Sequence, residues 1–207
     1  MSEKIVYVID DDEGVRKSLA LLLNSMGVTA VCFSSALEFL NERHASMEGC
    51  LLVDVRMPEM SGLELQRVLN ERDVTLPIIF ITGHGDVSLA VRAMRAGAFD
   101  FIEKPFRDQE LLERINQAFV ANETRNAEVR AKAVISKRLE LLTPREHEIM
   151  DRIVSGQANK LIALELGLSE RTVEIHRAKV MAKMQASSLA ELVVMVTRSD
   201  SSRSPLK

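Results

Sequence analysis

Five short apolar runs, each followed by a stretch with helical periodicity, constrain most strongly what this chain can fold into. Strands are predicted at residues 5–9, 29–33, 50–54, 77–82 and 99–103, and helices at 13–26, 35–43, 61–72, 85–96 and 107–120. Strands that alternate with helices through short connections form a parallel sheet with helices on both faces. The first, third and fourth runs are apolar throughout, so we expect those strands at the centre of the sheet. The pattern predicts an α/β domain, with a doubly wound five-stranded parallel sheet, over residues 1–120.

A second, all-α unit is predicted from Thr143 onward. Thr143-Pro144-Arg145-Glu146 is a capping box with Pro at the first helical position. Four short helices are expected, at residues 144–155, 159–166, 170–184 and 188–197. The domain is therefore placed at 143–197, and the polar residues 198–207 are predicted to form a disordered tail.

The segment between these units contains neither Gly nor Pro from Phe106 to Leu142 and is rich in helix formers. We predict that the fifth helix continues into a semi-rigid helical linker over residues 121–142. A flexible, disordered connector is the alternative.

Charge and composition narrow the possible functions. Residues 1–120 carry a net charge of −7, whereas 121–142 and 143–207 each carry +2. An acidic first part suits a cation site, and a mildly basic second part permits binding to nucleic acid. No apolar run approaches the length of a membrane span, and no signal-peptide layout begins the chain. Cys32 and Cys50 have no metal-ligand spacing, so we expect a cytoplasmic protein without a membrane partner.

Chemically useful side chains stand at or next to the ends of four predicted strands. An acidic triplet, Asp10-Asp11-Asp12, follows the first strand, while Asp54, Thr82 and Lys104 stand at or just after three others. In an open α/β sheet these strand ends meet at one edge, where sites usually lie. Carboxylates held close together favour a hard divalent cation such as Mg²⁺. The set therefore predicts a Mg²⁺-dependent aspartyl phosphorylation site.

Each member of the set has a chemical role in this interpretation. Asp54 is the expected nucleophile, which would form an acyl phosphate. Lys104 and Thr82 would each bond a phosphoryl oxygen, since phosphoryl transfer asks a protein mainly for positioning and charge neutralisation. A cis Lys104-Pro105 bond would turn the ammonium into the site.

Residues 1–120 resemble a response-regulator receiver domain along their whole length. The motifs that carry the resemblance are VIDDDEGVR, LLVDVRMPEMSGLEL, PIIFITGHGD and AGAFDFIEKPF. The resemblance implies a flavodoxin-like fold and a phosphoacceptor, Asp54, that receives its phosphoryl group from a histidine kinase. It implies Mg²⁺ ligation by Asp11, Asp54 and the backbone carbonyl of Arg56, with Asp10 nearby. Thr82 and Phe101 match the family's switch pair.

Two loop positions border the expected phosphoryl group. Arg56 and His84 each stand two residues after a site residue, and we predict that they tune the lifetime of the phosphoryl group. For His84, an ordinary loop residue is the alternative.

The segment ANKLIALELGLSERTVEIHRAKVMAKM predicts two helices joined by a turn at Gly167. Such a pair is a helix-turn-helix, whose second helix enters the major groove of DNA. Leu161, Ile162, Leu166, Leu168, Val173 and Val180 are expected to form a small core. The segment resembles the LuxR/FixJ-type helix-turn-helix, and RTVEIHRAKVMAKM resembles the FixJ subgroup in particular.

The predicted DNA contacts divide by role. Glu174 and Ile175 are expected to face base edges. His176 is expected either to bond a phosphate or to pack. The candidates for phosphate contacts, which fix register without reading sequence, are Asn159, Lys160, Arg171, Thr172, Arg177, Lys179 and Lys183. The last helix is used for dimerisation in the family, and its apolar positions here are Leu189, Leu192, Val193 and Val196.

The sequence is thus identified as a member of the FixJ/NarL class of two-component response regulators. The resemblance implies a homodimer that forms on phosphorylation, binds promoter DNA and, with RNA polymerase, acts as an activator. It implies no enzymatic activity beyond slow self-dephosphorylation. The alternative is a phosphorylation-independent DNA-binding regulator whose receiver is only a scaffold.

Overall fold

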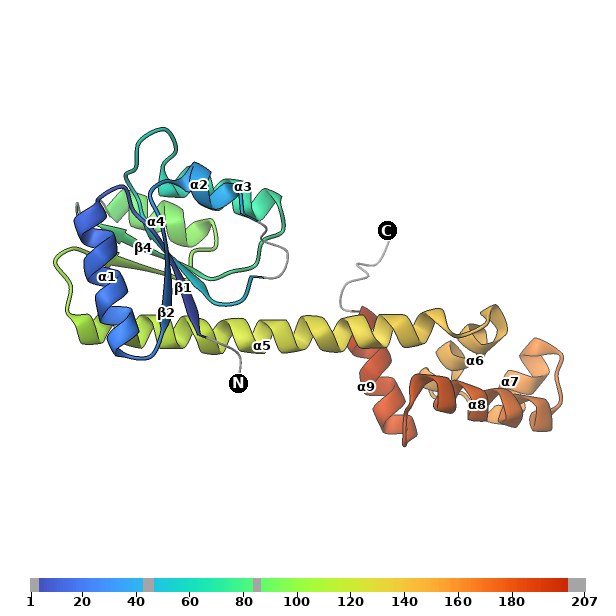
Figure 1. The fold of residues 1–207 in the computed structure, drawn as a ribbon. Helices are drawn as coiled ribbons and strands as arrows, with labels where there is room; N and C mark the ends of the chain where they lie inside the picture. The colour runs from blue at the N-terminus through green and yellow to red at the C-terminus, as the bar shows by residue number, and fades with distance from the viewer. Residues whose placement is uncertain (1–3, 43–46, 84–86, 201–207) are drawn as a thin grey trace. The chain divides into compact units, whose positions relative to one another are not determined.

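The structure is a computed structural model that describes residues 4–42, 47–83 and 87–200 (Figure 1). The chain divides into two compact units, Met1–Arg125 and Asn126–Lys207.

The first unit contains a five-stranded parallel sheet in the order β2-β1-β3-β4-β5. Its strands are β1 (Ile5–Ile9), β2 (Thr29–Phe33), β3 (Cys50–Asp54), β4 (Ile78–Thr82) and β5 (Asp100–Glu103). The strand order reverses between β1 and β3, which pair directly with Val6 opposite Cys50. In such sheets the crevice at the carboxyl ends of the strands on either side of the reversal binds ligands. The predicted doubly wound α/β fold is confirmed.

Helices cover both faces of this sheet, because alternate strand residues point to opposite sides (Figure 1). Tyr7 and Ile9 pack with residues of α2, α3 and α4, whereas Val6 and Val8 pack with residues of α1 and α5. The helices are α1 (Glu13–Ser25), α2 (Ala36–Leu40), α3 (Gly62–Glu71), α4 (Val87–Arg95) and α5 (Asp108–Glu140). Helix α2 ends three residues before the predicted position.

Helix α5 is a single element of 33 residues that belongs to both units. Its first turns place Leu111 and Ile115 in the core of the first unit, and Ile135 lies in the core of the second. The predicted boundary of the receiver, residue 120, falls within this helix, as does most of the predicted linker.

The second unit is all-α and consists of the end of α5 and four further helices. These are α6 (Pro144–Val154), α7 (Asn159–Leu166), α8 (Glu170–Met184) and α9 (Leu189–Asp200). The capping box predicted at Thr143 and Glu146 is present at the start of α6. Gly167 ends α7 in the left-handed conformation, and Ser169 caps α8. Helix α9 runs to Asp200, three residues into the segment predicted to be a disordered tail.

The core of the second unit differs from the prediction at one position. Ile162, Val173 and Val180 are fully buried, whereas Leu161 is 44% exposed. Leu161 stands on the outer side of α7 with Leu164, which is 80% exposed, whereas Ile162 and Ala163 face the core.

Within the described residues, no single helix is long and apolar enough to cross a membrane. Helices α8 and α9, which are bent by 60° relative to each other, reach the length and apolar composition of a membrane span only when they are taken together.

Candidate functional sites

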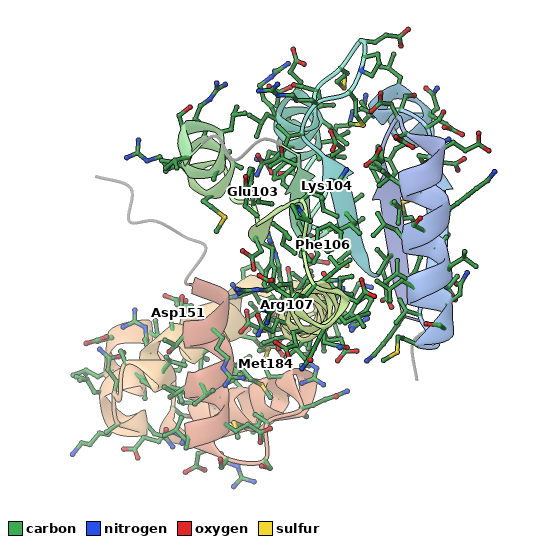
Figure 2. The ribbon with its side chains drawn as sticks, turned by 90° about the vertical axis from the view of Figure 1, so that its left-hand side faces the viewer. Glu103, Lys104, Phe106, Arg107, Asp151 and Met184 are labelled. Carbon is green, nitrogen blue, oxygen red and sulfur yellow. The ribbon has the colours of Figure 1, made fainter. Side chains whose placement is uncertain are left out.

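Three of the side chains predicted for the phosphorylation site, Asp10, Asp54 and Lys104, meet at the carboxyl ends of β1, β3 and β5. The Lys104 ammonium donates to Asp10 Oδ2 at 3.0 Å and to Asp54 Oδ1 at 3.1 Å. Asp10 is 3% exposed, and the Asp54 side chain is 12% exposed. Figure 2 shows Lys104 on the connection between β5 and α5. The fold thus holds one cation between two carboxylates.

Backbone contacts fix the strand ends that carry Lys104, Thr82 and Asp54. The Lys104 backbone N–H donates to Thr82 O at 2.7 Å, which joins the ends of β4 and β5, and the Lys104-Pro105 bond is cis. Thr82 is 2% exposed at the end of β4. Gly62, the first residue of α3, approaches the end of β3 so closely that a Cβ there would lie 2.5 Å from Asp54 O.

Burial and pairing shift the acidities of the paired groups. Burial is the largest influence on Asp54 and raises the pKa of its carboxyl, although bonds from the Arg56 backbone N–H and from Lys104 oppose it. Burial by itself would lower the pKa of Lys104, but its bonds to Asp10 and Asp54 and their negative charges outweigh burial and raise the pKa. The lysine therefore stays protonated, and both carboxylates are offset by one positive charge.

The acidic triplet divides into three roles. Asp10 is buried beneath Lys104, and its Oδ1 accepts from the Asp12 backbone N–H at 2.9 Å. Asp11 is exposed. Asp12 caps α1, because its Oδ1 accepts from the backbone N–H groups of Gly14 and Val15. Asp12 is thus engaged as a helix cap.

The remaining predicted residues of the receiver lie around this cluster. The Arg56 backbone N–H donates to Asp54 Oδ2 at 2.7 Å, and the Arg56 side chain is exposed. Phe101 is half-buried on β5 beside Phe80, with the ring centroids 6.5 Å apart. His84 lies outside the described residues.

The donor chemistry of the site fits Mg²⁺. The predicted ligands, which are Asp11, Asp54 and the Arg56 carbonyl, would supply only hard oxygen atoms, and Mg²⁺ typically takes one or two carboxylates and keeps several waters. In the parts of the chain that the structure describes, no group of three or more His, Cys, Asp or Glu side chains is arranged to hold a metal. The predicted ligand set contains two carboxylates and one backbone carbonyl, so it is smaller than the groups of three side chains to which this finding applies.

In the second unit, α8 presents a mixed polar surface. Arg171, Glu174, Ile175 and Lys179 are exposed, and Ile175 is 50% exposed. Val173, Val180 and Met184 on the opposite side are fully buried. The helix thus separates a core face from an outer face that has the residue types of a DNA-reading surface.

Several predicted phosphate contacts are already engaged within the unit. Arg177 donates to Asn159 Oδ1 at 3.3 Å, which links α8 to the start of α7. The Thr172 hydroxyl lies 2.8 Å from that of Ser169, the cap of α8. Lys160, on α7, is exposed.

Lys183 is tied to the interior of its unit, whereas His176 is only half-buried. The Lys183 ammonium donates to Leu141 O at 3.0 Å and to Glu146 Oε2 at 2.6 Å. The hydrogen bond from Lys183 and those from Thr143 lower the pKa of Glu146 to about 2. His176 is half-buried, and its Nδ1 has no hydrogen-bond partner within the described residues. For Lys183 a structural role is visible, and its predicted DNA contact stays a prediction.

The apolar positions predicted for dimerisation on α9 do not share one environment. Leu192 is fully buried and Val196 is 6% exposed, so both serve the core of their own unit. Val193 is half-buried, Leu189 is 38% exposed and Val194 is 49% exposed. Leu189 and Val194 are thus the exposed large apolar side chains of α9.

Two family models match the chain. The response regulator receiver domain matches residues 6–116, and the luxR family of bacterial regulatory proteins matches residues 140–196. The chain belongs to the response regulators. It carries a luxR-type DNA-binding domain, and α7 and α8 lie within the second match.

Known response regulators are similar over nearly the whole chain. The response regulator protein TodT of Pseudomonas putida is 44% identical, over 94% of this chain and 86% of TodT. The transcriptional regulatory protein FixJ of Rhizobium meliloti (strain 1021) is 47% identical, over 94% of this chain and 96% of FixJ. Among solved structures, the response regulator StyR has a TM-score of 0.87 at 42% identity, and it covers 95% of this chain and 100% of its own. Full-length FixJ from B. japonicum has a TM-score of 0.60 at 42% identity, covering 97% and 99%. The predicted relationship to FixJ-like regulators is confirmed.

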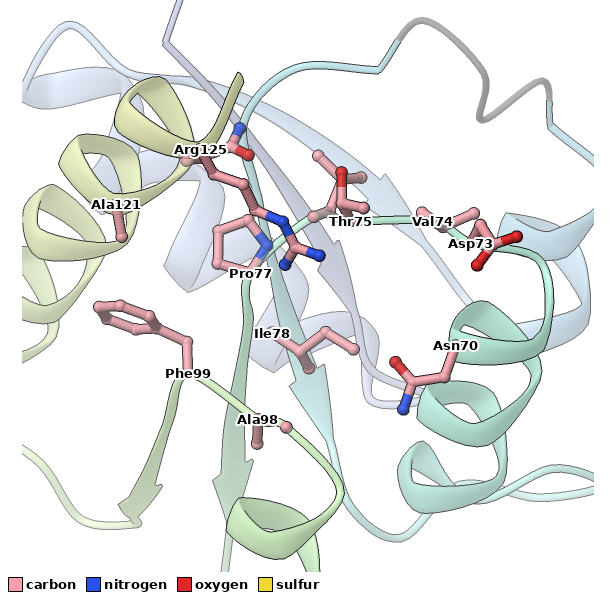
Figure 3. Close-up of a pocket in the computed structure, with 13 residues that line it drawn as sticks. Asn70, Asp73, Val74, Thr75, Pro77, Ile78, Ala98, Phe99, Ala121 and Arg125 are labelled. Atoms are coloured by element: carbon pink, nitrogen blue, oxygen red, sulfur yellow. The ribbon is translucent and has the colours of Figure 1, made fainter. Parts of the chain in front are cut away.

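This response regulator also has a hollow of about 360 Å³ where β4 and β5 begin (Figure 3). Arg125 reaches over Pro77 from α5, and Phe99 lies across from them (Figure 3). Asn122 is 6% exposed and donates to Gly49 O, while its Oδ1 has no hydrogen-bond partner within the described residues. The hollow lies at the amino ends of the strands, so it is separate from the cluster of Lys104, Asp10 and Asp54 at their carboxyl ends.

Sequence reasoning missed two features of the response regulator's sites. Arg16, on α1, donates to Asp10 O at 2.7 Å and so fixes the backbone of a site residue. Arg138, near the end of α5, donates to Met184 O at 3.0 Å, at the end of α8. The sequence marks neither arginine, because both bind backbone carbonyls, which no side-chain motif reveals.

Proposed function

We propose that this response regulator accepts a phosphoryl group on Asp54 from a histidine kinase, and that phosphorylation controls its binding to promoter DNA. The observation that supports the proposal best is the Lys104 ammonium held 3.0 Å from Asp10 and 3.1 Å from Asp54, in a chain that also carries a luxR-type DNA-binding domain. A receiver used only as a scaffold has no need of a buried pair of carboxylates around a lysine.

The transfer step follows from the placement of Asp54. One carboxylate oxygen attacks the phosphorus of a phosphohistidine, a P–O bond forms and the P–N bond breaks. The electron pair remains on the imidazole nitrogen, which takes up a proton. Asp54 is 12% exposed on its side chain, which is enough for one oxygen to face an incoming donor. When bound by Asp11, Asp54 and the Arg56 carbonyl, with Asp10 nearby, Mg²⁺ neutralises the negative charge that the carboxylates and phosphoryl oxygens bring together.

The neighbouring residues then hold the product. Lys104 exchanges its bond to Asp54 for one to a phosphoryl oxygen, and it remains tied to Asp10. The Thr82 hydroxyl, at the end of β4, bonds another phosphoryl oxygen, and Phe101 turns inward as Thr82 moves. Arg56 borders the phosphoryl group and, with His84, sets how long it survives. Slow self-dephosphorylation is the only catalysis in this scheme.

Phosphorylation favours a dimer by shifting an equilibrium between two states of the receiver. Helix α4 supports this proposal, because Val87, Val91 and Met94 are 77%, 43% and 46% exposed at the spacing of a single helix face. On α9, Leu189 and Val194 supply a second exposed apolar surface. Paired copies would read two half-sites, so the operator is roughly palindromic.

On DNA, α8 enters the major groove. Glu174 accepts from cytosine N4 and Ile175 contacts a thymine methyl group, while Lys179 and Arg171 bind phosphates. The regulator acts as an activator together with RNA polymerase.

Selection from a random-sequence DNA pool tests the proposal. Wild type and Asp54→Ala are each selected with Mg²⁺, with and without beryllofluoride, a phosphoryl mimic. The expected result is palindromic enrichment only for wild type with the mimic. Equal enrichment in all four arms would make the receiver a scaffold, and no enrichment in any arm would remove the transcription-factor function.

A further inference from the structure

We propose that Arg138 of α5 is a positioning residue for DNA recognition, because it caps the C-terminal end of the recognition helix α8. The inference rests on the proposed function for its effect on DNA binding. Nothing in the family match predicts it, since the luxR-family match begins at residue 140.

The contact is made by two nitrogens of one guanidinium group. Arg138 Nη1 donates to Met184 O at 3.0 Å, and Nη2 donates to Gln185 Oε1 at 2.6 Å. Met184, labelled in Figure 2, is the last residue of α8, and Gln185 is its C-cap. The last carbonyls of a helix lack partners within the helix, and a cation at that end also meets the negative pole of the helix dipole. Arg138 therefore supplies both a donor and a charge where α8 needs them.

The capped residue has an unfavourable backbone conformation. Gln185 has φ of 53°, in the left-handed region where a residue with a Cβ is disfavoured and where Gly is usual at a helix end. The Gln185 side chain is held by the same guanidinium that binds the helix carbonyl. The two bonds from the Arg138 guanidinium thus stabilise the turn at which α8 ends.

Neighbouring contacts hold the end of α5, which carries Arg138, against the other helices of the unit. Ile135, one turn before Arg138, and Leu142 are each 7% exposed, and they share a core with the fully buried Met184. The carbonyl of Leu139 lies 2.9 Å from His147 Nε2, and Lys183 of α8 donates to Leu141 O. The end of α5 is therefore part of the DNA-binding unit, and Arg138 ties it directly to α8.

The consequence for recognition follows from helix geometry. Ile175 precedes Met184 by nine residues, which is about 14 Å along a helix. Releasing one end of α8 lets the helix tilt, and a tilt displaces the side chains in its middle. Contacts to base edges depend on exact placement, whereas phosphate contacts are attractive over a range of positions. Loss of the cap should thus weaken specific binding more than non-specific binding.

The test compares full-length Arg138→Ala with Lys137→Ala, which removes the same charge one residue away on an exposed side chain. Binding is measured to the selected operator and to random duplex DNA, over a range of salt concentrations. For Arg138→Ala, affinity for the operator should fall about tenfold, while non-specific affinity and the slope of log affinity against log salt stay unchanged. Lys137→Ala should leave the operator preference unchanged. Equal losses on both DNAs, with a slope reduced by about 1, would show that Arg138 touches a phosphate instead.

A rescue variant separates capping from general damage to the fold. Gly adopts positive φ without a steric penalty, so Gln185→Gly in the Arg138→Ala background should recover most of the operator preference. Failure of this rescue would overturn the capping explanation.

A measurement without DNA keeps this inference apart from the proposed function. Amide hydrogen exchange at residues 181–185 should become faster in Arg138→Ala than in Lys137→Ala, with exchange in α6 unchanged. Equal exchange in the two variants would overturn the inference even if DNA binding is confirmed. If wild type binds no operator, the proposed function fails, and the exchange experiment still decides whether Arg138 caps α8.

Discussion

The two units place their functional residues in opposite ways. In the receiver, Lys104 meets carboxylates that are 94 and 50 positions away in the chain, and only the sheet brings them together. In the DNA-binding unit, the outer face of α8 is formed by neighbours such as Glu174, Ile175 and Lys179 on one helix. The receiver site therefore depends on the whole fold, whereas the reading surface can change without disturbing its core. Single substitutions can test each side of this contrast.

The largest expected effect is on phosphoryl acceptance. Asp54→Asn removes the attacking oxygen, so labelling from a small acyl phosphate donor with Mg²⁺ should fall to background. The matched control is Asp73→Asn, an exposed position beside the hollow at the other ends of the strands. Labelling of Asp73→Asn at the wild-type level is expected. Retained labelling in Asp54→Asn would move the acceptor to another residue.

A steric change should show how tightly the receiver site is built into the fold. In Gly62→Ala the new Cβ would lie 2.5 Å from Asp54 O, and overpacking of this kind lowers the free energy of unfolding by about 1–3 kcal/mol. Tyr7 is the chain's single tyrosine and is buried in the receiver, so its fluorescence reports on this unit in denaturant unfolding.

Gly83→Ala is the control for that change, because a Cβ at Gly83 meets no atom within 4 Å. Its free energy of unfolding should stay within about 0.5 kcal/mol of wild type. Equal stability of the two variants would mean that the strand end can move away from α3.

The ion pair of Lys183 and Glu146 gives the DNA-binding unit an acid-sensitive contact. The pKa of Glu146 is lowered from 4.5 to about 2 in the folded unit, so its stabilisation is complete above pH 4.5 and is lost as the pH falls toward 2. Lys183→Met should reduce this pH dependence, and it should lower the free energy of unfolding at neutral pH. Circular dichroism in denaturant measures both, with the receiver transition identified by Tyr7 fluorescence.

Lys179→Met is the control, because Lys179 is exposed on the same helix and carries the same charge. It should keep the wild-type dependence on pH. If both variants behave alike, the bond between Lys183 and Glu146 contributes nothing to stability.

The smallest expected effect is on the phosphate contacts of α8. Lys179→Met should weaken binding to all DNA sequences to a similar extent, and the slope of log affinity against log salt should decrease by about 1. Glu174→Gln should instead change the preferred base at one position of each half-site. A change in base preference for Lys179→Met would place that lysine at a base edge.

Sequence reasoning predicted the elements of the receiver closely. Strands β1, β2 and β3 have the predicted bounds, and β4 and β5 each begin one residue later. Local signals mark such elements, because apolar runs, caps and Gly positions act over a few residues. The same signals predicted which side chains would gather at the strand ends, since parallel strands place their carboxyl ends at one edge.

Contacts across the fold were harder to predict. Leu161 was expected in the core and is 44% exposed, because hydrophobicity alone does not say which side of a short helix faces inward. The bond of Lys183 to Glu146, a partner 37 positions away, was not predicted, and the DNA contact of Lys183 stays a prediction. The burial of Leu192 and Val196 in the core of their own unit was not predicted either, and dimerisation through α9 stays a prediction.

The sequence by itself determined the α/β and all-α units, the side chains that we propose as the phosphorylation site, and the membership in the response regulators. These follow from local periodicity and from motifs, which are properties of neighbouring residues. Only the tertiary structure decided that Lys104 bridges Asp10 and Asp54 and that Arg138 holds the end of α8. Each of these contacts joins groups that lie far apart in the chain. Their relative positions are set by the packing of the whole unit, which no short segment of the sequence encodes.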